Sequence, residues 1–226
     1  GNEILSGRTQ DTNTSTLSIW LNSLGIRVQE VRTISDIEKT IINTVNELRK
    51  KYDYIFTSGG IGPTHDDITA SSISKAFNLT YGPHKEAMAI LEKYYKPGEF
   101  NEGRKKMACM PTEANLILNP TSGAPGFNVE NVFCLPGVPS ILKSMLGGIT
   151  HKLIGGDPIL SHIINLRTVE SEIAKSLTNV QMNNKDVDIG SYPFFRAGKL
   201  GVAIVLRSSK QNKIDKCNSE ILKFVK

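Results

Sequence analysis

The residues best suited to chemistry lie in one segment, residues 58–69, which reads Ser-Gly-Gly-Ile-Gly-Pro-Thr-His-Asp-Asp-Ile-Thr. An apolar run that predicts a buried strand precedes it, and a predicted helix follows it. Its glycines allow backbone N–H groups to approach an anion, and the helix N-terminus adds positive potential. The segment lacks the lysine of a Walker A loop and does not match G-x-G-x-x-G. We therefore expect Gly59, Gly60, Gly62 and Thr64 to bind a phosphate-bearing ligand.

Two adjacent carboxylates, Asp66 and Asp67, follow the glycines. A carboxylate beside a phosphate repels it, and a divalent cation between the two removes that conflict. Mg²⁺ favours one or two carboxylates together with phosphate oxygens, so the pair predicts an Mg²⁺ site. The alternative is that either aspartate caps the following helix. His65 is expected at the loop surface, because one histidine cannot assemble a zinc site.

Strand and helix signals alternate around this segment, which predicts a parallel sheet covered by helices on both faces. The apolar spacing predicts helices over residues 13–24, 37–48, 69–77, 85–95 and 140–146, with Asp11 and Asp36 as caps of the first two. Strands are expected over residues 26–34, 52–57, 115–118 and 131–135.

The character of the chain changes at Gly155-Gly156-Asp157-Pro158, which is typical of a linker. The short elements that follow predict a small α+β lobe that resembles a split βαβ unit. Its expected strands are residues 161–167, 187–191 and 200–207, and its expected helices are residues 170–177 and a segment after 213. The expected domains are therefore residues 1–156 and 157–226.

Composition argues against nucleic-acid-binding, membrane-spanning and disulfide-rich proteins. The net charge is +5, from 27 Lys and Arg against 22 Asp and Glu, but no long basic run is present, so nucleic-acid binding is not expected. No stretch approaches the roughly 18 apolar residues of a membrane span. Three dispersed cysteines exclude a disulfide framework and a CxxC metal site, and a reducing cytoplasm fits them best. The sequence begins as if in the middle of a helix or strand, and we expect a further strand before Gly1.

Residues 59–69 resemble the GG(L/I)GPTxDDxT signature of the MoaB/Mog molybdopterin-binding domain, in its CinA-like branch. Other segments resemble further parts of that pattern in the same order: residues 1–7 (GDE(I/L)LxG), 11–13 (DxN), 119–126 (NPxGxAPG) and 135–140 (LPGVPSE). Glu170-Ser171 and residues 190–193 match the small lobe of this branch more weakly.

The resemblance implies a three-layer α/β/α domain with a mostly parallel sheet and a site at the carboxyl ends of the strands. Members bind molybdopterin or a nucleotide that carries a diphosphate, and they are expected to be homo-oligomers. The Mog-like branch transfers adenylyl groups to molybdopterin, whereas CinA-type proteins cleave pyrophosphate bonds in ADP-ribose-like substrates. The related domain of FAD synthase is linked to FAD hydrolysis. The principal acidic residue of the family falls on Asp67, and the aspartate of DxN falls on Asp11.

Two further groups of residues are candidates for ligand contacts. Pro136, Gly137 and Ser140 open a helix and would present N–H groups to a second edge of the ligand, or form a structural turn. Arg104 would bind phosphate, since guanidinium groups do so in a bidentate way, or belong to a solvated helix face.

The chain departs from the family pattern at two positions. Asn2 replaces an acidic residue, and Ile141 stands where LPGVPSE has glutamate, so one carboxylate near the ligand is lost. Three functions are compatible with these residues. The first is Mg²⁺-dependent hydrolysis of the pyrophosphate bond of an ADP-ribose- or FAD-like dinucleotide, with Asp67 and Asp11 as catalytic residues. The second is binding of molybdopterin or a nucleotide without turnover. The third is adenylyl transfer to molybdopterin.

Overall fold

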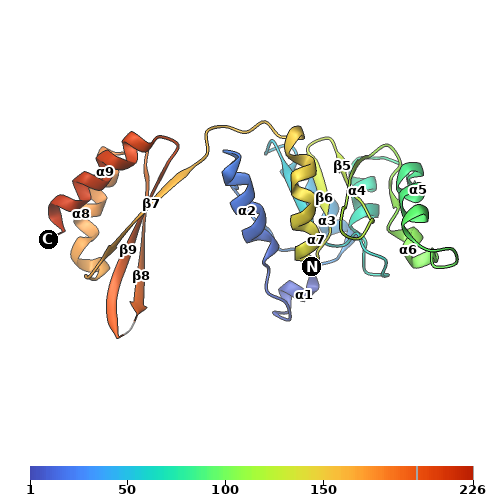
Figure 1. Ribbon diagram of the computed structural model, residues 1–226, viewed down its shortest axis with the longest axis horizontal. Coiled ribbons are helices and arrows are strands. Elements are labelled where there is room, and N and C mark those ends of the chain that lie inside the picture. Colours follow the sequence, from blue (N-terminus) through green and yellow to red (C-terminus); the bar gives the residue numbers. More distant parts are fainter. Residues whose placement is uncertain (197, 226) are drawn as a thin grey trace. The chain divides into compact units, whose positions relative to one another are not determined.

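The computed structural model describes residues 1–196 and 198–225. They form two compact units (Figure 1). Unit 1 comprises Gly1–Trp20 and Gln29–Ile154, and unit 2 comprises Leu21–Val28 and Gly155–Lys226. None of the helices in the described residues has the length and apolar character needed to cross a membrane.

The sheet of unit 1 has four strands in the order β1-β6-β5-β4. β1 pairs with β6 in parallel, whereas β6 with β5 and β5 with β4 are antiparallel pairs. The expected α/β class is confirmed, and parallel pairing within the described sheet is limited to β1 and β6. The strands are β1 (Ile55–Ser58), β4 (Asn115–Ile117), β5 (Gly126–Val129) and β6 (Val132–Leu135).

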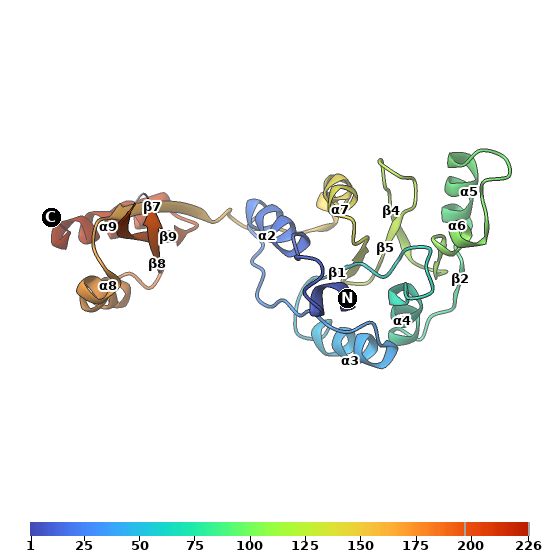
Figure 2. The ribbon, with the colours of Figure 1, turned by 90° about the horizontal axis from the view of Figure 1, so that it is seen from below.

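Helices cover both faces of this sheet, as Figure 2 shows. One face carries α3 (Glu38–Leu48) and α4 (Thr69–Ala76), and the other carries α2 (Asn13–Ser23) and α7 (Pro139–Met145). The remaining elements of unit 1 are α1 (Asn2–Leu5), β2 (Tyr81–Pro83), α5 (Lys85–Tyr94), α6 (Glu102–Lys106), β3 (Cys109–Pro111) and the 3₁₀ helix η1 (Leu146–Lys152).

Alternating side chains of β6 explain the three layers. Val132 and Cys134 join the core beneath α3 and α4, whereas Phe133 and Leu135 join a second core with α2 and α7. All four side chains are buried. Because successive strand residues point to opposite faces, a strand that is apolar throughout must be covered on both sides.

The strand expected over residues 26–34 is wrong, because the backbone there is irregular. Val28 and Val31 are 37% and 54% exposed, so their β-branched side chains meet no sheet face. The cap expected at Asp36 is also wrong. Its carboxylate accepts a hydrogen bond from Asn2 N at 2.8 Å, and Ile37 is the N-cap of α3.

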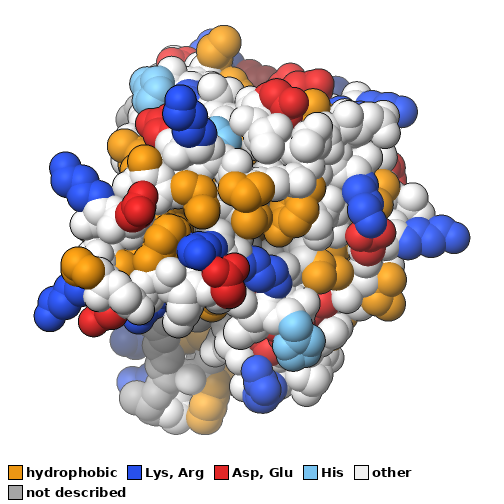
Figure 3. Space-filling model, turned by 90° about the vertical axis from the view of Figure 1, so that its right-hand side faces the viewer, with side chains coloured by type: hydrophobic (Ala, Val, Ile, Leu, Met, Phe, Trp, Pro, Cys, Tyr) orange, Lys and Arg blue, Asp and Glu red, His pale blue; other side chains and the backbone are white. Residues whose placement is uncertain are grey.

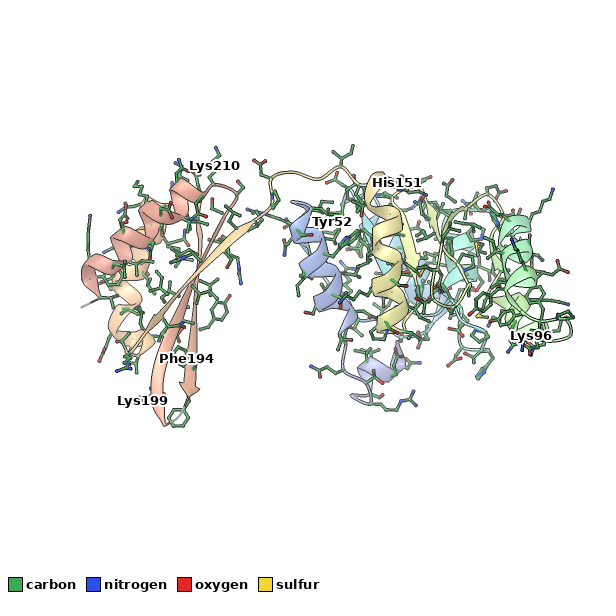
Figure 4. All side chains as sticks on the ribbon, in the orientation of Figure 1. Tyr52, Lys96, His151, Phe194, Lys199 and Lys210 are labelled. Carbon is green, nitrogen blue, oxygen red and sulfur yellow. The ribbon has the colours of Figure 1, made fainter. Side chains whose placement is uncertain are left out.

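Unit 2 is an antiparallel sheet in the order β7-β9-β8, packed against two helices. Its core joins alternate residues of β7 and β9 to one face of each helix, and Ile204 and Ile214 are fully buried there. The β8–β9 hairpin is longer than expected, and Figure 4 labels Phe194 and Lys199 near its turn. The elements are β7 (Leu160–Leu166), α8 (Glu170–Asn183), β8 (Asp188–Arg196), β9 (Lys199–Ser208) and α9 (Gln211–Phe224).

Charged side chains are mixed over the surface that Figure 3 draws. Lysine and arginine side chains are scattered there among acidic and apolar ones. The described side chains in that view therefore do not form a continuous basic surface.

Candidate functional site

The sheet of unit 1 brings three sequence motifs to one edge. β1 and β6 are parallel neighbours, so Ser58 and Leu135 end side by side. β5 runs against β6 and β4 runs against β5, so the connection from β4 to β5 lies at that same edge. We call it the carboxyl edge. The segments 59–69, 118–125 and 136–140 all leave the sheet there, where open α/β sheets bind ligands.

Asn13 joins the DxN segment to this edge. Its Nδ2 donates to Ser58 Oγ and to Gly137 O, each at 2.7 Å. The side chain is only 9% exposed. One carboxamide therefore links the start of α2 to the ends of both parallel strands, a contact between residues 45 and 124 positions apart.

Asp11 lies at the start of α2. Its carboxylate accepts hydrogen bonds from the Thr14 backbone N–H, at 3.0 Å, and from the Thr14 hydroxyl. The helix cap expected there is thus confirmed. Burial raises the pKa of Asp11, but hydrogen bonds from Thr14 and from the Asn13 backbone outweigh it and leave the pKa below its ordinary value. The side chain is ionised at neutral pH.

The glycine loop after β1 packs directly against the loop after β6. Gly59 and Gly60 have φ of +100° and +69°, which side chains disfavour. Gly59 N donates to Leu135 O at 2.9 Å. A Cβ on Gly137 would lie 3.3 Å from Gly59 Cα. The glycines therefore allow a close approach of two backbones at the carboxyl edge.

Thr64 contacts both acidic residues of the loop. Its N–H donates to Asp67 Oδ2 at 2.8 Å, and its Oγ1 lies 2.6 Å from both Asp67 Oδ2 and Asp66 Oδ1. The bond from the Thr64 hydroxyl lowers the pKa of Asp66. Neither aspartate caps α4, whose N-cap, Ile68, has no side-chain cap bond. The capping alternative is wrong, and the two carboxylates meet at one hydroxyl instead. His65 is exposed, as expected.

The basic residues of α6 differ in what they contact. Lys106 Nζ donates to Thr64 O and so touches the acidic loop. The Arg104 guanidinium lies 4.1 Å from the ring centroid of Tyr95 and 3.5 Å from the Glu99 carboxylate. Its described contacts are therefore away from the glycine loop. Sequence reasoning missed Lys106, although the cluster Arg104-Lys105-Lys106 was the signal that contained it.

The loop between β4 and β5 is ordered by one buried asparagine. Asn119 Oδ1 accepts from Thr121 N and Ser122 N, and Asn119 Nδ2 donates to Ala124 O at 2.8 Å. Gly123 has a φ of +76°, and a Cβ there would overlap the Tyr94 ring. This loop is a formed part of the carboxyl edge.

The turn after β6 leads into α7. Pro136 is half-buried, and Gly137 and Ser140 are exposed at the carboxyl edge. Ile141 instead packs against the apolar core beneath α2 and α7. The departure from glutamate is therefore accommodated as a core contact.

The acidic residues fit a cation shared with phosphate oxygens. Within residues 1–196 and 198–225 no group of three or more His, Cys, Asp or Glu could hold a metal by itself. Asp66 and Asp67 nevertheless converge on Thr64. Two carboxylates with substrate oxygens are the usual Mg²⁺ set in phosphate chemistry, whereas an all-protein cage is not.

Family models match both parts of the chain. Residues 1–156 match the family described as "Probable molybdopterin binding domain", and residues 158–226 match "FAD synthase, middle domain". A protein of Archaeoglobus fulgidus is 34% identical over 193 residues, covering 85% of this chain and 82% of its own length. A protein of Thermoplasma volcanium is 34% identical over 199 residues, covering 85% and 78%.

A solved structure extends the agreement to the fold. The crystal structure of CinA from Thermoplasma acidophilum, described as of unknown function, superposes with a TM-score of 0.62 at 31% identity. The superposition covers 67% of this chain and 93% of that one. The chain therefore belongs to the family of the probable molybdopterin binding domain, in its CinA-like branch.

Proposed function

We propose that this protein is an Mg²⁺-dependent hydrolase that cleaves the pyrophosphate bond of an ADP-ribose- or FAD-like dinucleotide. One observation carries the proposal: Thr64 gathers Asp66 and Asp67 beside a glycine loop at the carboxyl edge. A carboxylate pair next to backbone donors suits a ligand that brings both phosphate and a cation.

Different residues of the chain would bind the diphosphate, the cation and the attacking water. The N–H groups of Gly59 and Thr64 already donate within the protein, so the other N–H groups of the glycine loop and those of the turn after β6 would hold the diphosphate. Asp66 and Asp67 would hold Mg²⁺. Bound Mg²⁺ would neutralise phosphate charge and lower the pKa of water. Asp11, which is ionised, would accept a hydrogen bond from the attacking water and orient it.

The proposed reaction is a simple hydrolysis. The water oxygen forms a bond to one phosphorus, and the bond from that phosphorus to the bridging oxygen breaks. The bridging oxygen leaves with the second phosphate, and the water proton passes to solvent. ADP-ribose would give AMP and ribose 5-phosphate, and FAD would give AMP and FMN. The match of unit 2 to the middle domain of FAD synthase supports a flavin dinucleotide as one substrate to test.

Liquid chromatography of the products tests the proposal. We expect AMP from ADP-ribose or from FAD when Mg²⁺ is present and none when a chelator replaces it. A folded sample that releases no AMP from either substrate would contradict the proposal.

A second candidate is ligand binding without turnover, with molybdopterin or a nucleotide as ligand. Ile141 favours it, because this side chain packs into the core where the family motif has glutamate. If the missing carboxylate is what prevents turnover, Ile141→Glu should release AMP while the wild type binds the same nucleotide without reaction. A wild type that hydrolyses ADP-ribose or FAD removes this candidate.

A further inference from the structure

Ser58 and Asn13 form a contact at the carboxyl edge for which the motifs assign no role. Ser58 is the last residue of β1 and is exposed, whereas Asn13 opens α2 and is 9% exposed. Asn13 Nδ2 lies 2.7 Å from Ser58 Oγ and 2.7 Å from Gly137 O. One nitrogen therefore contacts both the last residue of β1 and the turn after β6.

The carbonyl of Gly137 fixes the direction of these hydrogen bonds. A carbonyl oxygen only accepts, so the Asn13 atom that faces it must be the amide nitrogen. The second N–H of that nitrogen then points at Ser58 Oγ, which accepts it. The hydroxyl hydrogen of Ser58 is left over, and within residues 1–196 and 198–225 it meets no acceptor.

The other end of the Asn13 carboxamide supports this orientation. Its Oδ1 is buried and has no hydrogen-bond donor among the described residues. Buried polar atoms are nearly always paired, so an unpaired one needs a reason. Turning the carboxamide over would set Oδ1 against Gly137 O, and two acceptors repel each other. The bonds to Ser58 and Gly137 therefore fix the orientation, and the unpaired oxygen follows from them.

We propose that Ser58 binds the ligand directly, by donating its hydroxyl hydrogen to a diphosphate oxygen, and that Asn13 is the positioning residue that keeps this hydrogen free. The inference rests on the proposed function only in taking the ligand to carry a diphosphate. Ser58 directly precedes Gly59, so its hydroxyl and the loop N–H groups are donors on one continuous backbone. Asn13 also holds the glycine loop beside the turn after β6.

Affinity for ADP, measured by calorimetry in the presence of Mg²⁺, tests this inference without requiring turnover. Ser58→Ala should weaken binding about tenfold or more, because it removes a hydrogen bond to a charged group. Asn13→Asp should weaken it at least as much, since the new carboxylate would draw the Ser58 hydrogen inward and repel Gly137 O. The double variant should bind no more weakly than Asn13→Asp, because both changes remove the same donor.

Two variants serve as matched controls. Asn131 makes a similar contact at the opposite edge of the sheet, where its Nδ2 donates to Arg49 O at 3.0 Å and to Tyr52 O at 2.9 Å. Asn131→Asp should lower the unfolding temperature and leave the affinity for ADP unchanged. Ser15→Ala removes an exposed hydroxyl from α2 and should change neither quantity.

The outcomes separate this inference from the proposed function. Wild-type affinity in both Ser58→Ala and Asn13→Asp overturns the inference. Additive losses, or an equal loss in Asn131→Asp, show that Asn13 only supports the fold and overturn its positioning role. A wild type that binds ADP but hydrolyses neither ADP-ribose nor FAD contradicts the proposed function, and the variants still decide the inference. A folded wild type that does not bind ADP overturns the inference, and AMP release from ADP-ribose or FAD decides the proposed function separately.

Discussion

The two edges of the unit 1 sheet differ in whether their carboxylates form ion pairs. At the edge where β1 and β6 begin, which we call the amino edge, charges neutralise one another. Glu30 accepts hydrogen bonds from Tyr52 at 2.7 Å, from Arg32 and from Lys51 at 3.2 Å. The Arg32 guanidinium also pairs with Glu47. These hydrogen bonds, with that from Tyr52 the largest, lower the pKa of Glu30 to about 2.

At the carboxyl edge the acidic residues have no such partners. Asp66 and Asp67 share the Thr64 hydroxyl, and no ion pair among the described residues includes either of them. The nearby Lys106 ammonium is bonded to a carbonyl oxygen. Carboxylates thus form ion pairs within the protein at one edge and, among the described residues, have no ion-pair partner at the other.

Each edge also has one asparagine that joins two chain segments. Asn131 bonds two carbonyl oxygens, whereas Asn13 bonds one carbonyl oxygen and one hydroxyl. Only the second contact leaves a spare donor, the Ser58 hydrogen. An asparagine that bonds two carbonyl oxygens only joins two backbone segments. An asparagine that bonds a carbonyl oxygen and a serine hydroxyl also leaves the hydroxyl hydrogen free to donate to a ligand.

The largest expected effect lies at the carboxyl edge. A Cβ on Gly62 would sit 2.7 Å from Asp67 Oδ2, so Gly62→Ala must displace that carboxylate. We expect AMP release to fall about 100-fold, because misplacing a group that positions the reaction by about 1 Å costs about that much. Stability should change by less than about 1 kcal/mol. Gly147→Ala is the control, since a Cβ there meets nothing within 4 Å. Unchanged kinetics in Gly62→Ala would contradict the assignment of activity to the carboxyl edge.

A smaller effect is expected at the amino edge. Asn131→Asp replaces a donor to Arg49 O and Tyr52 O with a carboxylate that repels both. Urea unfolding should show a loss of about 2 kcal/mol, because two part-buried carbonyl oxygens lose their donor and face a negative charge instead. AMP release at a temperature where the variant is folded should equal that of the wild type. A large kinetic loss in the folded variant would mean that the two edges are not separate in function.

The smallest expected effect is a pH dependence at Glu30. A folded-state pKa of about 2, below the ordinary 4.5, means that the ionised form favours folding. This contribution is complete above about pH 4.5 and is lost as the pH falls through about 2. The stability gap between wild type and Glu30→Gln in urea unfolding should therefore be constant from neutral pH to about 5 and then close. A gap that persists to pH 2 would show that Glu30 acts through packing alone.

Local sequence signals predicted most of the elements. The helices α2, α4, α5 and α7 start and end close to their expected positions, because apolar spacing and caps are local properties. The expected strand over residues 26–34 failed because β-branched residues form a strand only where a neighbouring strand pairs with them. β5 was not expected at all, since Gly126 and the preceding prolines and glycines are typical of a loop.

The candidate site was predicted in its motifs and not in its contacts. The glycine loop and the aspartate pair stand together in the sequence, so their chemistry could be inferred directly. The bonds of Asn13 to Ser58 and Gly137 depend on which strands become neighbours. The contact of Lys106 with Thr64 spans 42 positions and could not be distinguished from a solvated helix face.

The most direct test of the account is the rate of AMP formation from ADP-ribose by the wild type and Asp67→Asn, measured side by side with Mg²⁺. Asparagine keeps the shape of the side chain and an acceptor for Thr64 N, so the loop should persist and thermal unfolding should change little. We predict that kcat/KM falls at least about 100-fold, because the negative charge that holds the cation is lost. An Asp67→Asn protein that forms AMP at the wild-type rate would contradict the account.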